Sequence, residues 1–188
     1  FFMNREDFPI LSTGLIYFDN GATTLKPKSV VEKMTDYYYN YPANIHRGDY
    51  KISLKASDEY EKVRTKVKNF INASSEDEIV FTEGATDSLN RVVFGFMEDY
   101  LTNGDEVIIS KAEHASAVLP WLILARRKNI KVVFVPLEEN HELSYTTLEK
   151  YVTAKTKVIS LAAVTNVIGD VRDINKIGKL CHDRDILF

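Results

Sequence analysis

Apolar and polar positions along the chain follow two rhythms that predict strands and helices in alternation. Five short apolar runs have the length of strands, at residues 78–82, 106–110, 131–135, 157–164 and 186–188. Four stretches between them carry apolar residues at every third or fourth position, within residues 89–100, 118–125, 148–152 and 174–180. Strands that read as nearly continuous apolar runs and alternate with helices are typical of a mostly parallel sheet with helices on both faces. The fold class predicted for this part of the chain is therefore α/β.

The first part of the chain shows only the helical rhythm. Apolar residues recur at helical spacing after Pro27 and again within residues 60–70. These patterns predict an N-terminal helical segment, residues 1–75, that precedes an α/β domain, residues 76–188. The last predicted strand runs to the end of the chain, whereas chain termini usually lie at the surface. We expect the chain to be a fragment of a longer protein; a chain with a short final strand is the alternative.

Composition and charge narrow the classes of function. The 188 residues include 24 Lys and Arg against 27 Asp and Glu, a net charge of −3, so the chain lacks the basic excess of a general nucleic-acid binder. The single cysteine, Cys181, cannot form an intramolecular disulfide, which favours a reducing, cytoplasmic location. One cysteine and four scattered histidines give no clustered zinc site, and no apolar run approaches the ~18 residues of a membrane span. We therefore expect a protein that binds neither nucleic acid nor a membrane nor a metal.

A turn that can hold an anion follows the first predicted strand of the α/β domain. Gly84, Ala85 and Thr86 lead from residues 78–82 into a helix. The N–H groups and the dipole at the start of a helix favour an anion such as phosphate. The alternative is a strand–helix turn that Thr86 caps without any ligand.

Two more polar motifs follow predicted strands. His114 comes after the strand at 106–110, and Asn166 comes after the strand at 157–164. The carboxyl ends of the strands form the edge at which open α/β sheets bind ligands. An imidazole there can stack on a flat ring or move a proton, and an amide can contact a ligand. The alternatives are a histidine bonded to its own loop and an Asx turn before Gly169. Together the three motifs predict one ligand-binding crevice.

Two further features of the sequence have weaker functional interpretations. His46 and Arg47 lie in a loop between the two early helices, where such a pair can contact an anion or a neighbouring subunit, or belong to an ordinary polar loop. Cys181 shares the apolar stripe of the last helix with Ile177, which predicts a buried, inert thiol. The signatures of P-loop, dinucleotide-binding and α/β-hydrolase enzymes are missing from the sequence.

Five segments in order along the chain resemble one enzyme family. They are residues 16–24 (IYFDNGATT), 44–48 (NIHRG), 81–90 (FTEGATDSLN), 113–121 (EHASAVLPW) and 164–169 (VTNVIG). In this order and spacing they resemble the class V aminotransferase-fold enzymes, and among them the Suf-type cysteine desulfurases and selenocysteine lyases. No single segment is decisive, but five in order are highly specific.

The resemblance implies pyridoxal 5′-phosphate as cofactor and the large domain of a fold-type I enzyme as the fold. The loop at Gly84, with Ala85 and Thr86, would bind the cofactor phosphate. His114 would be catalytic, stacking on the pyridine ring and helping proton transfers. Asn166 would contact the ring hydroxyl. By the same resemblance, His46 and Arg47 would line the site entrance or a dimer interface.

The resemblance also implies the reaction of a cysteine desulfurase, which takes sulfur from L-cysteine and leaves alanine and an enzyme persulfide. It further implies a homodimer, a sulfur-acceptor protein and a role in iron–sulfur cluster assembly. Tyr50 and Ala163 stand where many Suf-type members carry histidine, which keeps two alternatives open. One is another class V enzyme, such as a selenocysteine lyase or an aminotransferase, and the other is a non-enzymatic α/β module that binds an anion. The family's cofactor-anchoring lysine, pyridine-pairing aspartate and persulfide-forming cysteine would follow Phe188, so we expect this chain alone to be inactive.

Overall fold

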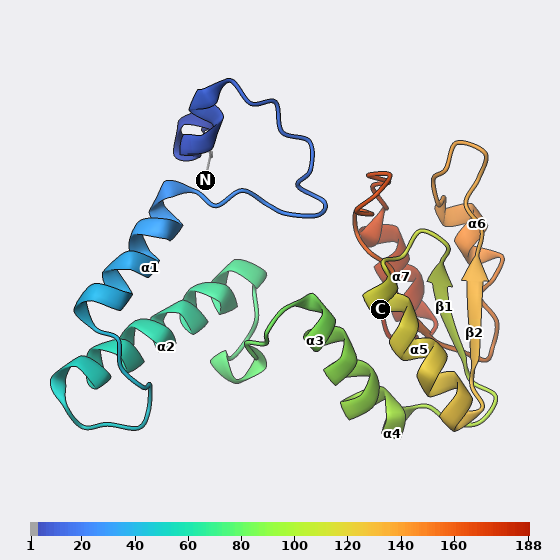
Figure 1. Cartoon of the computed structure of the whole chain (residues 1–188). Helices are drawn as coiled ribbons and strands as arrows, with labels where there is room; N and C mark the ends of the chain where they lie inside the picture. The colour runs from blue at the N-terminus through green and yellow to red at the C-terminus, as the bar shows by residue number, and fades with distance from the viewer. Residues whose placement is uncertain (1–3) are drawn as a thin grey trace. The chain divides into compact units, whose positions relative to one another are not determined.

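A computed structural model describes residues 4–188 (Figure 1). The first three residues of the predicted segment 1–75 lie outside the described residues. The chain divides into two compact units, Phe1–Phe81 and Thr82–Phe188. No helix within the described part of the chain combines the length and the apolar character that crossing a lipid bilayer requires.

The first unit is helical, as its sequence pattern predicts. Its elements are the 3-10 helices η1 (Arg5–Asp7), η2 (Pro9–Thr13) and η3 (Glu76–Glu78) and the α-helices α1 (Lys28–Asn40) and α2 (Lys51–Ile71). Pro27 stands at the N-cap of α1, where its missing N–H group costs no helical hydrogen bond. The two α-helices meet around Tyr41, whose ring lies 4.2 Å from the ammonium of Lys55 on α2.

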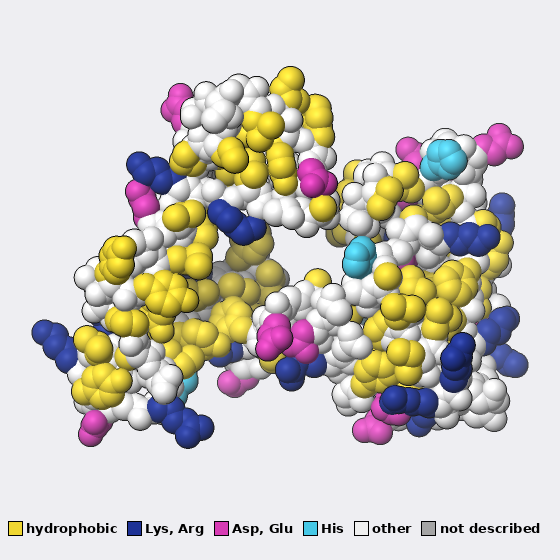
Figure 2. Space-filling model, in the orientation of Figure 1, with side chains coloured by type: hydrophobic (Ala, Val, Ile, Leu, Met, Phe, Trp, Pro, Cys, Tyr) yellow, Lys and Arg dark blue, Asp and Glu magenta, His cyan; other side chains and the backbone are white. Residues whose placement is uncertain are grey.

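The apolar stripe of α1 remains at the surface of the first unit. None of the residues of α1 is buried, and Met34 and Tyr38 are more than half exposed. Figure 2 shows apolar side chains at the surface over this helix. Within the unit, α2 buries only Ser53 and Ala56, so the helical pattern here is not accompanied by a large core.

The second unit contains a parallel sheet, which confirms the predicted α/β class. The three strands are β1 (Glu106–Ser110), β2 (Lys131–Val135) and β3 (Thr156–Ile159). They lie in the order β2-β1-β3, and β1 is parallel to both neighbours. The helices are α3 (Ala85–Arg91), α4 (Glu98–Tyr100), α5 (Ala115–Lys128), α6 (Tyr145–Glu149) and α7 (Ile174–Asp183), with the π-helix η4 (Val92–Met97) joining α3 to α4.

Helices cover both faces of the sheet. Successive side chains of a strand point to opposite faces, and every residue of β1 is buried. Val107 and Ile109 belong to an apolar cluster with Trp121 and Leu124 of α5 and with η4. Ile108 belongs to a second cluster that includes residues of α6 and α7. The continuous apolar run in the sequence therefore corresponds to a strand buried on both faces.

Three predicted strands differ from the structure. Residues 78–82 form no strand: η3 ends at Glu78, Ile79 has extended backbone angles, and Val80 is 72% exposed. An extended segment becomes a strand only when a neighbour completes its hydrogen bonds, and no described segment does so here. The strand predicted at 157–164 ends at Ile159, and Val164 instead pairs with Val171 in an antiparallel bridge. The run at 186–188 contributes one parallel bridge, from Leu187 to Val158.

A buried carboxylate at the start of β1 predicts how stability depends on pH. Glu106 accepts hydrogen bonds from Thr153 (2.7 Å) and Lys131 (3.0 Å). The Thr153 hydrogen bond and then the Lys131 contact lower the pKa of Glu106. Its stabilisation is therefore complete above the unfolded-state pKa of about 4.3 and is lost as the pH falls through the lower folded-state pKa.

We expect Glu106→Gln to lower the free energy of unfolding by about 1 kcal/mol at pH 7. The loss stays this small because the partner Lys131 is largely solvated, so its ion pair with Glu106 is weak. The difference in the free energy of unfolding between this variant and the unsubstituted protein should shrink below pH 4. Urea unfolding at pH 7 and pH 3 measures both values. The exposed Glu139→Gln is the matched control, and an equal pH dependence in both variants would contradict the prediction.

Candidate functional site

The loops that follow β1 and β3 lie at the carboxyl edge of the sheet. After Ser110, the loop from β1 leads to His114, which begins α5. After Ile159, the chain forms a hairpin closed by the Val164–Val171 bridge, and Asn166 lies in its turn. Because β1 and β3 are parallel neighbours, both loops leave the sheet at the same edge.

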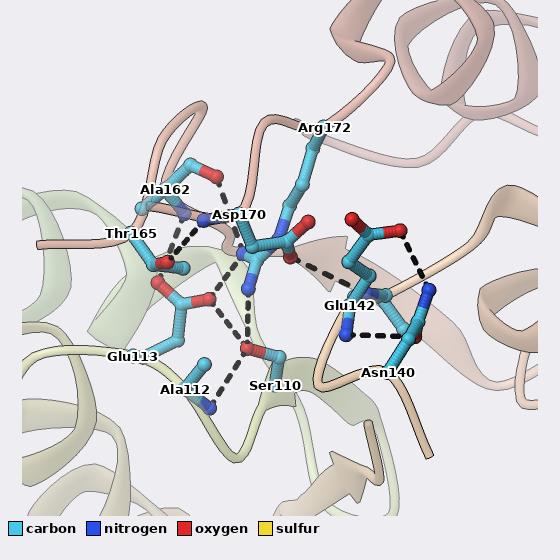
Figure 3. A network of polar contacts seen from close by, with 10 residues as sticks. Ser110, Ala112, Glu113, Asn140, Glu142, Ala162, Thr165, Asp170 and Arg172 are labelled. Carbon is cyan, nitrogen blue, oxygen red and sulfur yellow. Dashed lines mark hydrogen bonds and ion pairs between the residues drawn. The ribbon is translucent and has the colours of Figure 1, made fainter. Parts of the chain in front are cut away.

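A buried network of charged side chains joins these two loops (Figure 3). Arg172 donates hydrogen bonds to Glu113, to Asp170 (3.2 Å) and to the hydroxyl of Ser110 (2.7 Å). Glu113 in turn accepts a hydrogen bond from the N–H of Ala162 at 2.9 Å. The three charged side chains are at most 4% exposed. The sequence pattern assigned no role to these three side chains, although Asp170 and Arg172, two positions apart in extended chain, point to the same side.

His114 has one ring nitrogen engaged and one free. Its Nδ1 accepts a hydrogen bond from the backbone N–H of Ser116 at 3.2 Å and lies 2.8 Å from the Ser116 hydroxyl. A backbone N–H can only donate, so Nδ1 is an acceptor and the neutral ring carries its proton on Nε2. Nε2 has no hydrogen-bond partner within residues 4–188. The ring thus caps α5 with one nitrogen, while its other nitrogen has no partner among the described residues.

The turn before α3 depends on a glycine. Gly84 has φ 153° and ψ 179°, a backbone region that residues with a Cβ rarely adopt. The hydroxyl of Thr82 donates to the Gly84 carbonyl oxygen at 3.2 Å and fixes the turn. Gly84 is also the N-cap of α3, and no side chain caps the helix there. The first-turn N–H groups, which include those of Ala85 and Thr86, are therefore uncapped, and Thr86 is not the cap residue that the sequence suggested.

The start of α3 lies at the same end of the second unit as the start of α5. The two helices pack against each other, and in Figure 1 both run opposite to β1. Asp87, in the first turn of α3, pairs with Arg91 at 2.9 Å and accepts the N–H of Glu83. The Arg91 contact and then the Glu83 hydrogen bond lower the pKa of Asp87, so this turn carries one carboxylate with its own cation.

His46 and Arg47 belong to the first unit, in the loop between α1 and α2. Nε2 of His46 lies 3.0 Å from a carboxylate oxygen of Glu61 on α2, and its backbone N–H donates to Ser57. Arg47 is exposed. The structure thus gives His46 a partner on its own unit, and the role of the pair at an entrance or subunit interface stays a prediction.

Cys181 lies inside the second apolar cluster, as its place on the helix predicts. The side chain is 2% exposed, and burial raises the pKa of the thiol. The thiol is therefore protonated at neutral pH and is not a nucleophile. Within residues 4–188, no three His, Cys, Asp or Glu side chains are placed to share a metal ion.

Comparisons with known proteins match nearly the whole chain. The family model described as Aminotransferase class-V matches residues 16–188. A probable cysteine desulfurase of Borreliella burgdorferi is 40% identical over 97% of this chain and 44% of the relative. The apo cysteine desulfurase of Thermococcus onnurineus NA1 is 37% identical with a TM-score of 0.89, over 98% of this chain and 45% of that one. The cysteine desulfurase CsdA of Escherichia coli is 32% identical with a TM-score of 0.83, over 97% and 46%. The chain spans less than half the length of these relatives.

Proposed function

The chain belongs to the aminotransferase class-V family, and on this premise we propose that the protein is a pyridoxal 5′-phosphate-dependent cysteine desulfurase. Membership confirms the family resemblance that the five sequence segments indicated. The observation that carries the proposed activity is the common carboxyl edge, where the loops of His114 and Asn166 are joined by one buried arginine. The substrate would be L-cysteine, and the products would be alanine and an enzyme persulfide.

The residues at this edge fit the cofactor that the family uses. The uncapped start of α3 would bind the phosphate through the N–H groups of Ala85 and Thr86. The bound cofactor supplies an electron-accepting ring that stabilises negative charge at the substrate Cα. Asn166, at the turn of its hairpin, would contact the ring hydroxyl.

His114 would be the catalytic residue that this chain contributes. The flat imidazole would stack on the cofactor ring, and the free Nε2 would hold or move a proton near the substrate. Its other nitrogen is fixed by Ser116, so the orientation of the ring and the position of its proton are set before any ligand arrives. A positioned proton carrier of this kind loses little freedom during the reaction.

The remaining parts of the proposal concern the intact enzyme. It would act as a homodimer, with His46 and Arg47 at the entrance or the subunit interface, and would pass its sulfur to an acceptor protein for iron–sulfur cluster assembly. A cytoplasmic location agrees with the single, buried cysteine of this chain.

The test is to assay the intact enzyme with L-cysteine and with other amino acids. We expect alanine and reducible sulfur in equal amounts from L-cysteine and a far lower rate of transfer of its amino group to keto-acid acceptors. An absorbance titration with pyridoxal 5′-phosphate tests cofactor binding separately. Turnover of L-selenocysteine without turnover of L-cysteine, or amino-group transfer without sulfur release, would instead assign the enzyme to another class V activity. Absence of cofactor binding would leave a non-enzymatic anion-binding module.

Gly84→Ala should weaken cofactor binding through the backbone alone. A Cβ at Gly84 would meet no atom within 4 Å, so steric crowding is not the cause. The backbone angles of Gly84 would cost about 1–3 kcal/mol with alanine, and 1.4 kcal/mol is a tenfold change in affinity. We expect the dissociation constant of pyridoxal 5′-phosphate to rise about tenfold. Gly95→Ala, also without nearby atoms but lacking the positive φ, is the matched control, and an equal effect of both substitutions would contradict the prediction.

A further inference from the structure

The side chain of Arg172 contacts two loops that are far apart in the sequence. It is fully buried, and all three of its guanidinium nitrogens donate hydrogen bonds. Nη1 reaches Glu113 on one loop and the carbonyl oxygen of Ala162 (3.2 Å) on the other. Nη2 reaches Ser110 at the end of β1, and Nε reaches Asp170 in the hairpin. These contacts join chain segments up to 62 residues apart.

Glu113 connects Arg172 to His114, because Glu113 contacts Arg172 and directly precedes His114 in the chain. One carboxylate oxygen accepts hydrogen bonds from Ser110 (2.7 Å) and Arg172, and the other accepts the N–H of Ala162 (2.9 Å). The residue before His114 is thus bound both to β1 and to the loop after β3. A displacement of Glu113 would move the first turn of α5, where His114 is the N-cap.

Asp170 connects Arg172 to the loop of Asn166, because it contacts both Arg172 and Thr165. Its carboxylate accepts from Arg172 and from the N–H of Leu143 at 3.2 Å. Its backbone N–H donates to the hydroxyl of Thr165 at 3.0 Å, and its carbonyl oxygen accepts the N–H of Thr165 at 3.1 Å. Thr165 directly precedes Asn166, so the base of the hairpin is held from both strands. Figure 3 shows Glu113 and Asp170 on opposite sides of the Arg172 guanidinium.

The chemistry of this network indicates that its role is to hold the two loops in one arrangement rather than to stabilise the fold. Burying three charged groups carries a large loss of hydration, and apolar residues in their place are often as stable. The network is complete, because no buried side-chain nitrogen or oxygen among the described residues lacks a partner. A planar guanidinium offers donors at fixed angles, which an ammonium cannot reproduce. Complete buried networks of this kind hold their members in one arrangement.

We propose that Arg172 is a positioning residue that, through Glu113 and Asp170, holds the loops of His114 and Asn166 in one fixed relation. This inference rests on the proposed function for its catalytic consequence. Arg172 itself is buried beneath the site and would not touch substrate or cofactor.

The structural test compares Arg172→Lys with Arg184→Lys in the intact enzyme. The first variant keeps the positive charge near Glu113 and Asp170, so it avoids leaving them without any cation. Arg184 forms one exposed ion pair in the same unit, with Glu149, and is the matched control. Amide hydrogen exchange by mass spectrometry follows the two loops, residues 110–117 and 160–172, and the strand β2.

We expect exchange in both loops to become about tenfold faster in Arg172→Lys, while exchange in β2 stays within about twofold of the unsubstituted enzyme. A general loss of stability would instead speed exchange in β2 as much as in the loops. A response in only one loop, in neither loop, or equally in β2 would overturn the inference.

The catalytic consequence is tested by a double-substitution cycle with His114→Ala. In the enzyme with His114, Arg172→Lys should lower kcat with L-cysteine about tenfold or more and change KM by less than about threefold. In the His114→Ala enzyme the same substitution should lower kcat by less than about threefold, because the group it positions is gone. Equal effects in both backgrounds would overturn the positioning role. If the unsubstituted enzyme does not turn over L-cysteine, the proposed function fails, and hydrogen exchange alone decides whether Arg172 holds the two loops.

Discussion

Replacing His114 by alanine is expected to lower kcat for L-cysteine by about 10²- to 10⁴-fold, the range that a positioned proton-transfer group contributes. Cofactor retention should fall much less, because the phosphate contacts at the start of α3 and the cofactor-anchoring lysine would supply most of the binding. Steady-state sulfide release and the absorbance of bound pyridoxal 5′-phosphate measure the two effects separately.

His114→Asn separates the catalytic role from the structural one. Asparagine is a favourable N-cap residue, so this variant should retain the start of α5 while lacking the imidazole. We expect it to be as inactive as the alanine variant but more stable, by about 1 kcal/mol. The exposed His182→Ala on α7 is the control for loss of a histidine. Full desulfurase activity in either His114 variant would remove this residue from the mechanism.

Replacing Arg172 by methionine is expected to lower the free energy of unfolding by about 3–5 kcal/mol. The substitution leaves the buried carboxylates of Glu113 and Asp170 without their cation, and an uncompensated buried charge has a cost of this size. Urea unfolding at pH 7 measures the loss. Arg184→Met, which breaks an exposed ion pair, should cost less than about 1 kcal/mol.

The substitution of all three charged residues together provides a second check. Glu113→Gln and Asp170→Asn, combined with Arg172→Met, remove both carboxylates along with the cation. We expect this variant to be more stable than Arg172→Met alone, because the charges without partners are gone. A loss below about 1 kcal/mol in Arg172→Met, or no recovery in the combined variant, would contradict the electrostatic explanation.

The sequence by itself determined the buried strands and the helices that cover them. The predicted bounds of β1 and β2 are those of the structure, because a strand buried on both faces must be apolar along its whole length and ends where turn residues begin. The α/β class follows from the same local signals. The parallel sheet also placed His114 and Asn166 at one edge, since residues after parallel neighbouring strands leave the sheet on the same side.

Pairing and charge burial were decided only by the tertiary structure. Residues 78–82 have the composition of a strand, but a strand requires a neighbour, and the sequence does not say whether one is present. The apolar run at 157–164 leaves the sheet after Ile159 because Val164 pairs with Val171 in a hairpin. Glu113 and Arg172 are 59 residues apart in the sequence, and the residues around each of them do not indicate that the two form an ion pair. Whether such charges are paired and buried depends on which segments the fold brings together. The local pattern of residues carries no information about which distant segments become neighbours.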